Sequence, residues 1–273
     1  MNTSPLNIWF KESPLAALVL PGLFVLGCIL YYGGIWFFRM RVGGRRMAAV
    51  AKEFGGTYRP DYNQTATKAL PQFEGTQLRL ARGAYNVVKA EWSLHDRPCT
   101  VWMGDAGNQW NSDALVQAVG GEIFASFIAV QCPFPKIHRA VILDRGLRSD
   151  EHFERVGYAV DLWESIQTYS EREGLLHMKL DLPDLDDIYD FRVDSPYAFH
   201  AMFNRRSINM LDARPGHIWI KDDIIMLECG DRVWSASEFI ARAQWLRDFI
   251  EAWDDAANPD AHDEELIKPR SLF

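Results

Sequence analysis

A histidine and a cysteine lie four positions apart in the segment 95–99, which reads HDRPC. A histidine close to a thiol can act as the base that makes the thiol a nucleophile. The same residues also have the composition of a turn, after which Cys99 begins a strand. We expect the plain turn. A catalytic site would need further residues from distant positions, and the candidates for it are Cys99, His95, His138 and Asp144.

Carboxylates are concentrated in the segment 181–190, which reads DLPDLDDIYD. Several carboxylates close together could bind Ca²⁺ or Mg²⁺, but the alternating ligands, central glycine and final glutamate of an EF-hand loop are missing. We expect a charged loop, either solvated or used as a docking surface for a basic partner. Its candidate partner contacts are Asp184, Asp186 and Asp187.

Other motifs that carry chemistry are missing from the sequence. It contains no P-loop, GxGxxG, HExxH or GxSxG. No two of its seven histidines stand three or four positions apart, so a metal site on a helix is not indicated. Arg205 and Arg206 could meet a phosphate, but we expect exposed side chains. The sequence therefore predicts no catalytic residues, no cofactor and no metal, and the alternative is a membrane-tethered, hydrolase-like enzyme.

Two tryptophans are candidates for contact with a partner protein. Trp110 lies among small and polar residues in GDAGNQWNSD, and Trp245 lies off the apolar stripe of its predicted helix. Tryptophan also fills ordinary cores, but it is enriched at the energetic centres of interfaces.

Residues 14–38 contain no charged side chain. A helix of that length would extend about 37 Å, compared with roughly 30 Å of membrane hydrocarbon. The basic residues follow this apolar segment, whereas they precede the apolar core of a cleaved signal peptide. We therefore expect a transmembrane helix at 14–38, kinked at Pro21.

An aromatic and basic band, WFFRMRVGGRRM, spans residues 36–47. Cytoplasmic flanks of spans carry the excess of arginine and lysine, so we expect the N-terminus outside and the large domain in the cytoplasm of a bacterium, at its inner membrane. The arginines would also lie near anionic lipid headgroups. The expected membrane-interface residues are Trp36, Phe37, Phe38, Arg39, Arg41, Arg45 and Arg46.

The chain from Met47 onward is acidic, with 24 basic and 36 acidic residues, a net charge of −12. An acidic domain repels phosphate backbones, so no nucleic-acid partner is expected. No cysteine pair is close in sequence, and we expect a reducing compartment without a disulfide framework. The four cysteines are Cys28, Cys99, Cys132 and Cys229.

The elements that position these residues are mostly strands first and helices later, which favours an α+β fold of mainly antiparallel sheet with packed helices. Ser235 and Glu238 form a capping box before a final helix. The expected strands are 76–82, 85–92, 99–103, 123–132, 139–143, 217–220 and 224–229, and the other expected helices are 45–54, 149–157, 162–173 and 196–211. The expected core-facing stripe of the final helix is Phe239, Ala243, Leu246, Phe249, Ile250 and Trp253.

The predicted organisation has five parts along the chain. They are a short external N-terminus at 1–13, a transmembrane helix at 14–38, a basic juxtamembrane helix at 39–56, a cytoplasmic α+β domain at 57–253 and an acidic flexible tail at 254–273.

Two segments, RRMAAVAKEFGG and HIWIKDDIIMLECGDRVWSASEFIARAQWLRDFI, combine a basic exit helix with a final hairpin and helix. In this the chain resembles uncharacterised bacterial single-pass membrane proteins that have a cytosolic α+β domain of unknown function. The resemblance covers most of the chain and implies a topology but no activity.

The predicted span, the acidic domain and the absence of catalytic motifs together predict a non-catalytic accessory or scaffold subunit. Its expected partner is an integral protein complex of the bacterial inner membrane, of a respiratory, photosynthetic, secretory or transport kind. The subunit would bind this complex through its span and its acidic domain.

Overall fold

The computed structural model describes residues 16–38, 43–60, 83–107, 125–133, 139–147, 170–229 and 233–253. The chain divides into two units, Met1–Arg45 and Arg46–Phe273. Several predictions lie outside the described residues: the strand 76–82, the helix 149–157, most of the helix 162–173 and the tail 254–273.

In the first unit, Ala16–Phe38 form the helix α2, which contains Pro21 and no charged residue. Side chains of α2 are described at Val19 and at positions 21–31. Over the described part of the chain, no helix has the length and apolarity needed to cross a membrane. The predicted transmembrane helix at 14–38 is therefore wrong.

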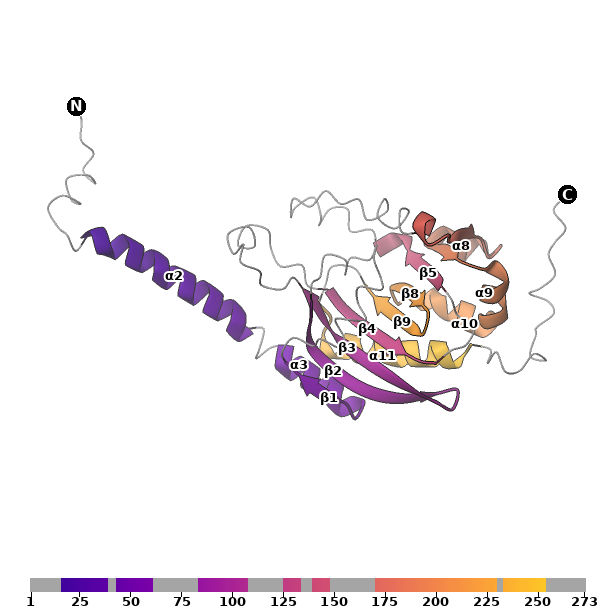
Figure 1. Cartoon of the computed structure of the whole chain (residues 1–273), viewed down its shortest axis with the longest axis horizontal. Helices are drawn as coiled ribbons and strands as arrows, with labels where there is room; N and C mark the ends of the chain where they lie inside the picture. The colour runs from indigo at the N-terminus through magenta and orange to yellow at the C-terminus, as the bar shows by residue number, and fades with distance from the viewer. Residues whose placement is uncertain are drawn as a thin grey trace, which may run out of the picture. The chain divides into compact units, whose positions relative to one another are not determined.

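The second unit is an α+β domain built on one nine-stranded sheet, in the order β1-β2-β3-β4-β9-β8-β5-β7-β6 (Figure 1). Every strand pairing is antiparallel, as expected from the sequence. The strands are β1 Thr57–Arg59, β2 Gly83–Leu94, β3 Arg97–Gly107, β4 Ala125–Gln131, β5 Arg139–Asp144, β6 Leu176–Met178, β7 Tyr189–Val193, β8 His217–Lys221 and β9 Ile224–Glu228.

Two hairpins of the sheet, β2–β3 and β8–β9, each have a short turn between their strands. Between β2 and β3 only His95 and Asp96 separate the paired residues Leu94 and Arg97, and both have positive φ, 49° and 59°. Two positive-φ residues match the right-handed twist of antiparallel strands, and aspartate and histidine tolerate this backbone better than most residues. The predicted hairpin turn is therefore confirmed, although β3 begins at Arg97, two residues before the expected Cys99. The second predicted hairpin, β8–β9, is confirmed as well.

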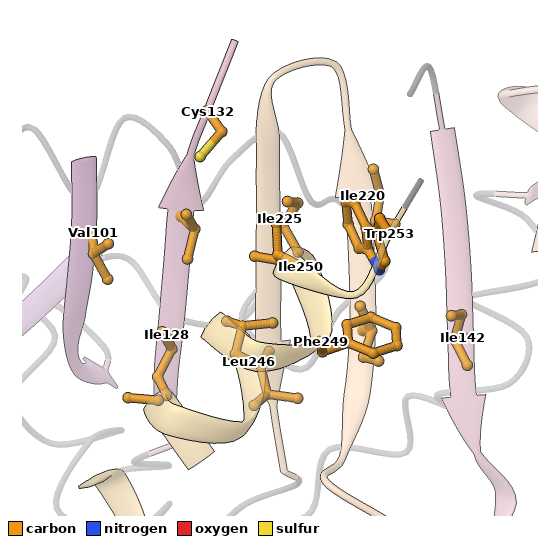
Figure 2. Close-up of a cluster of buried hydrophobic side chains, with 14 of the residues drawn as sticks. Val101, Ile128, Cys132, Ile142, Ile220, Ile225, Leu246, Phe249, Ile250 and Trp253 are labelled. Atoms are coloured by element: carbon orange, nitrogen blue, oxygen red, sulfur yellow. The ribbon is translucent and has the colours of Figure 1, made fainter. Parts of the chain in front are cut away.

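One face of the sheet is covered by helices, of which α11, Ala236–Glu251, is the longest in the second unit. Figure 2 shows Leu246, Phe249 and Ile250 of this helix directed at strand residues that include Ile128 and Ile225. The predicted capping box is present, since the Ser235 side chain accepts from the Glu238 backbone and the Glu238 side chain accepts in return. All six residues of the predicted stripe are buried.

The other helices carry the chain into and around this layer. α3, Gly44–Glu53, matches the helix predicted at 45–54 and is followed by Gly55, whose φ of 62° suits a glycine after a helix. The remaining elements are α8 Pro183–Ile188, α9 Pro196–Met202, α10 Arg205–Asn209 and the 3₁₀ turns η4 Arg145–Leu147 and η5 Met210–Ala213.

Two predictions in this region are wrong. The charged loop expected at 181–190 contains the helix α8, which proline begins and Asp186 caps by accepting from the backbone of Leu180 and Leu182. The single helix expected at 196–211 is divided, because the Asn204 side chain accepts from the Ser207 backbone and so starts a new helix, α10.

The opposite face of the sheet has its own buried cluster. Large rings from Trp102, Phe127 and Trp219 alternate there with small side chains such as Ala106 and Ala129. Strand residues on both faces are therefore buried, which explains why several of these strands read as continuous apolar runs.

Cys99 and Cys132 form a disulfide between neighbouring strands. Thr100 lies opposite Gln131 in the β3–β4 register, so the two cysteines stand opposite each other with Cα atoms 4.6 Å apart. The prediction of no disulfide is wrong, because antiparallel pairing joins residues that are 33 positions apart in sequence. Disulfides persist in oxidising environments, so the expected reducing compartment loses its basis.

Removing the disulfide should destabilise the domain. The variant with Cys99→Ala and Cys132→Ala is expected to lose about 2–4 kcal/mol in urea unfolding, because the cross-link no longer restricts the unfolded chain. Reductant should lower the stability of the wild type similarly and leave the variant unchanged. Cys229→Ala, which removes a buried free thiol, is the control for lost volume. A count of four reactive thiols in unreduced, denatured protein would contradict the disulfide.

Candidate functional site

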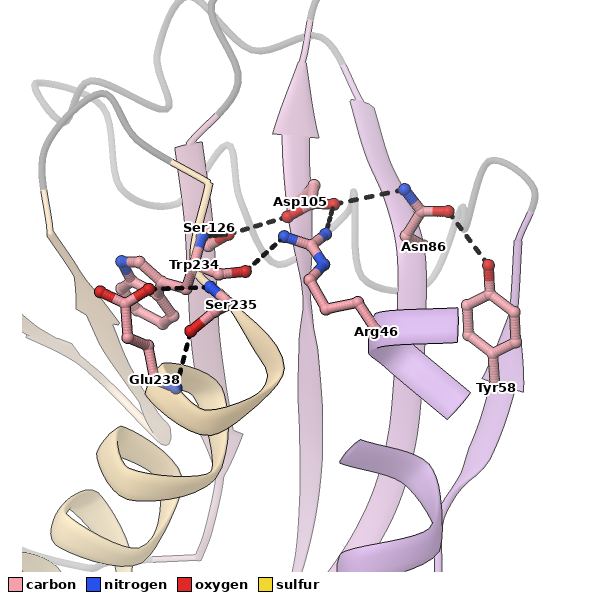
Figure 3. Close-up of polar contacts among 8 residues, drawn as sticks. All are labelled: Arg46, Tyr58, Asn86, Asp105, Ser126, Trp234, Ser235 and Glu238. Carbon is pink, nitrogen blue, oxygen red and sulfur yellow. Dashed lines mark hydrogen bonds and ion pairs between the residues drawn. The ribbon is translucent and has the colours of Figure 1, made fainter. Parts of the chain in front are cut away.

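One highly connected polar group among the described residues is the carboxylate of Asp105, buried near the end of β3 (Figure 3). Its Oδ1 accepts from Ser126 Oγ at 2.8 Å. Its Oδ2 accepts from Asn86 Nδ2 at 3.2 Å and forms an ion pair with the Arg46 guanidinium. We call these residues, with Tyr58 and Trp234, the Asp105 network.

The network joins parts of the chain that lie far apart in sequence. Arg46, in α3, also donates to the Trp234 carbonyl at 2.6 Å and lies over the Phe239 ring of α11, 5.4 Å from its centroid. The Trp234 backbone N–H donates to Ser126 Oγ at 2.9 Å. Arg46 was predicted to face lipid headgroups, and this is corrected: its side chain is 11% exposed and bound to the sheet. Its neighbour Arg45 is exposed.

Burial raises the pKa of Asp105, and the charge of Arg46 and the hydrogen bonds from Ser126 and Asn86 oppose that rise. The carboxylate therefore depends on Arg46 for its charged form, since removing the arginine would leave the desolvation unopposed by a cation. What this arrangement can do chemically is fix α3 and the start of α11 to the sheet and take up a proton when Arg46 is withdrawn.

A second polar cluster lies on the opposite face, where His217 and Glu228 stand opposite each other in the β8–β9 register. Burial lowers the pKa of His217 to about 4 and raises the pKa of Glu228 to about 8, so both are mainly neutral near pH 7. The Asp144 backbone N–H donates to His217 Nδ1 at 3.1 Å, and Trp219 Nε1 donates to Glu228 Oε1 at 2.9 Å. His217 Nε2 and Glu228 Oε2 have no hydrogen-bond partner among the described residues.

Asp144 itself is engaged by the backbone and by an arginine. Its carboxylate accepts from Arg214 Nε at 3.0 Å, forms a second bond with the same guanidinium and accepts from the Gly146 N–H at 2.9 Å. The hydrogen bonds to Asp144 and the negative charge of its carboxylate raise the pKa of Arg214. The Arg214 backbone has a positive φ of 48°. This ion pair therefore ties the turn before β8 to the end of β5.

The described residues proposed for an enzyme each have a structural partner. Cys99 is in the disulfide, and the ring of His95 contacts the Ile250 carbonyl, with His95 Nε2 at 2.7 Å. Asp144 is held by Arg214, and His138 lies outside the described residues. Among the described residues, no group of three or more histidine, cysteine or acidic side chains is placed to hold a metal.

The predicted partner contacts have different surroundings. Trp245 is half-buried at the edge of the core, where it stacks on Phe249, with ring centroids 4.7 Å apart, and donates to the Met210 carbonyl. Asp184 and Asp187 are exposed on α8, whereas Asp186 caps that helix. The structure does not describe Trp110, Arg39 or Arg41, nor the side chains of Trp36, Phe37 and Phe38.

Sequence reasoning missed Asp105, His217 and Glu228. Each lies in a strand whose neighbours are largely apolar, and that is a usable signal, because a charged group at a buried strand position needs a partner or an altered pKa. The partner of Asp105 could not be named from sequence, since Arg46 is 59 positions away.

No protein-family model matches the chain, and no curated protein matches it. One similar solved structure is the crystal structure of the mycobacterial trehalose monomycolate transport factor A, TtfA. It has 12% sequence identity and a TM-score of 0.45, over 79% of this chain and 98% of that chain. A likeness at this level carries no argument about activity or partners.

The buried ion pair should show strong coupling between its members. Arg46→Met is expected to cost about 3–5 kcal/mol, because it leaves the Asp105 carboxylate buried without its cation. Arg45→Met, on the exposed neighbour, should stay within about 0.5 kcal/mol of wild type. Asp105→Asn combined with Arg46→Met should cost less than the sum of the two single changes, by about 1–3 kcal/mol. Urea unfolding measures all four, and additive costs would contradict the pairing.

Glu228 should make stability fall as pH rises. Its pKa is raised from 4.5 to about 8, so the folded state holds a proton that the unfolded state has released, and stability is lost from about pH 4.5 up to pH 8. His217 acts in the opposite direction, because burial lowers its pKa to about 4. Its contribution to the stability of the folded protein is lost as pH falls from 6.5 to about 4.

Glu228→Gln keeps an acceptor for Trp219 and removes the titration. The variant should gain about 2–4 kcal/mol over wild type on going from pH 5 to pH 8.5, measured by urea unfolding at each pH. Glu91→Gln, at an exposed strand position, is the control and should follow the wild type. Parallel pH profiles for Glu228→Gln and wild type would contradict a protonated Glu228.

Proposed function

We propose that this chain is a non-catalytic accessory subunit that docks on a protein complex of the bacterial inner membrane. It uses two surfaces: the apolar side chains of α2 and the acidic, solvent-exposed side of α8.

The observation that carries the proposal is the exposure of α2. Among its described side chains, Leu23, Phe24, Ile29 and Leu30 are all between 59% and 74% exposed. Water-exposed apolar surface of this extent on a helix without a charged residue is unfavourable unless something apolar covers it. An apolar surface of the partner complex is the occupant we propose.

The acidic surface supplies selectivity for a basic partner. Asp184 and Asp187 are exposed on α8, next to the exposed side chain of Leu182. In the described part of the chain neither aspartate forms an ion pair, so each could meet a basic group of the partner. The net charge of −12 from Met47 onward gives the same preference at longer range.

The engagement of the candidate catalytic groups also supports an accessory role. Cys99 is in a disulfide, and Asp144 has two bonds to Arg214. Each of these groups has a structural partner that a catalytic role would have to displace.

The test is recovery of partners from native membranes in mild detergent, with the proteins identified by mass spectrometry. The full chain should bring down a stoichiometric complex, and the double change Asp184→Lys and Asp187→Lys should weaken its affinity at least about tenfold. Glu91→Lys, a charge reversal on β2, is the matched control. Phe24→Ser with Leu30→Ser should weaken recovery independently. Isolation of the chain alone, without a stoichiometric partner, would overturn the proposal.

A further inference from the structure

The α3–β1 segment, Gly44–Arg59, lies at one edge of the sheet. Among the described strands, β1 is the outermost and pairs with β2 alone, through three residue pairs. The helical part of the segment buries Met47, Val50 and Ala51. Three buried side chains anchor this short helix, compared with five in the longer α11.

Both elements of the segment are connected to one carboxylate. Arg46 in α3 pairs with Asp105 directly, and Tyr58 in β1 donates to Asn86 Oδ1 at 3.1 Å, while Asn86 donates to Asp105 (Figure 3). Asp105 lies in β3, one strand further into the sheet than β2. The Asp105 network therefore fastens the segment to a strand with which its backbone does not pair.

The position of the segment in the chain gives this fastening a consequence. The first unit ends at Arg45, inside the first turn of α3, so the rest of the α3–β1 segment is the first part of the second unit. If it detached, its residues could extend to about 50 Å at roughly 3.3 Å each. The chain between the first unit and the sheet would lengthen accordingly.

We propose that the α3–β1 segment is a releasable tether, held on the sheet by the Arg46–Asp105 ion pair, which opens as one unit while the rest of the sheet stays folded. Opening removes the edge strand β1 and the short helix α3 from the sheet. It leaves α11 and all pairings among the strands β2 to β9 in place. Partial opening of a weakly held element at the edge of a fold is an established form of native-state fluctuation. This inference concerns the connection between the units and stands independently of the proposed docking.

Amide hydrogen exchange on the full chain, followed by mass spectrometry, tests the proposal. Asp105→Asn should accelerate exchange at positions 44–59 at least about tenfold, while positions 236–251 of α11 stay within about twofold of wild type. Tyr58→Phe, which removes one hydroxyl, should accelerate the same positions to a smaller extent. Arg45→Met is the matched control and should leave both regions unchanged.

Two results would overturn the tether. One is equal acceleration at 44–59 and 236–251 in Tyr58→Phe, which would mean that the segment opens only with the whole domain. The other is unchanged exchange at 44–59 in Asp105→Asn. If Asp105→Asn does not fold, the Tyr58→Phe result decides alone, and its unchanged exchange at 44–59 would equally reject the proposal.

Discussion

The burial of one face of a wide antiparallel sheet by α11 is the contact on which the domain depends. The helix presents a continuous apolar stripe, and the strands beneath it supply side chains such as Ile128 and Ile225. A sheet face of this kind cannot remain in water, and a single long helix with a complete capping box covers much of it. The other helices follow from this arrangement, because they close the ends that α11 does not reach.

Periodicity and capping chemistry were enough to predict most of this layer from the sequence. Three features of this layer follow from patterns within a few residues of sequence, and all three are present in the structure. They are the stripe of α11, the capping box at Ser235 and Glu238, and the β8–β9 hairpin. The helix expected at 196–211 failed for an equally local reason, since Asn204 caps a new helix and was not recognised as a start signal.

Pairings across long stretches of chain could not be predicted in the same way. The Cys99–Cys132 disulfide and the Arg46–Asp105 ion pair both depend on which strands become neighbours. A buried aspartate in a strand predicts that a partner exists, but only the strand order identifies it. The expected span over 14–38 was an inference from length and composition, and the described helix did not support it. Asp184 and Asp187 were predicted as contacts and are exposed, and whether a partner binds them is a matter for experiment.

The strand order also constrains how the chain reaches its fold during synthesis. β4 and β5 are consecutive in sequence, yet the C-terminal hairpin β8–β9 lies between them in the sheet. Until that hairpin has left the ribosome, β4 and β5 each have an unpaired edge, and the apolar face above them has no α11. At roughly 5–20 residues per second this interval lasts several seconds. Open edges next to apolar faces are sites of aggregation, so the nascent chain has its greatest need of a chaperone just before its last hairpin and helix emerge.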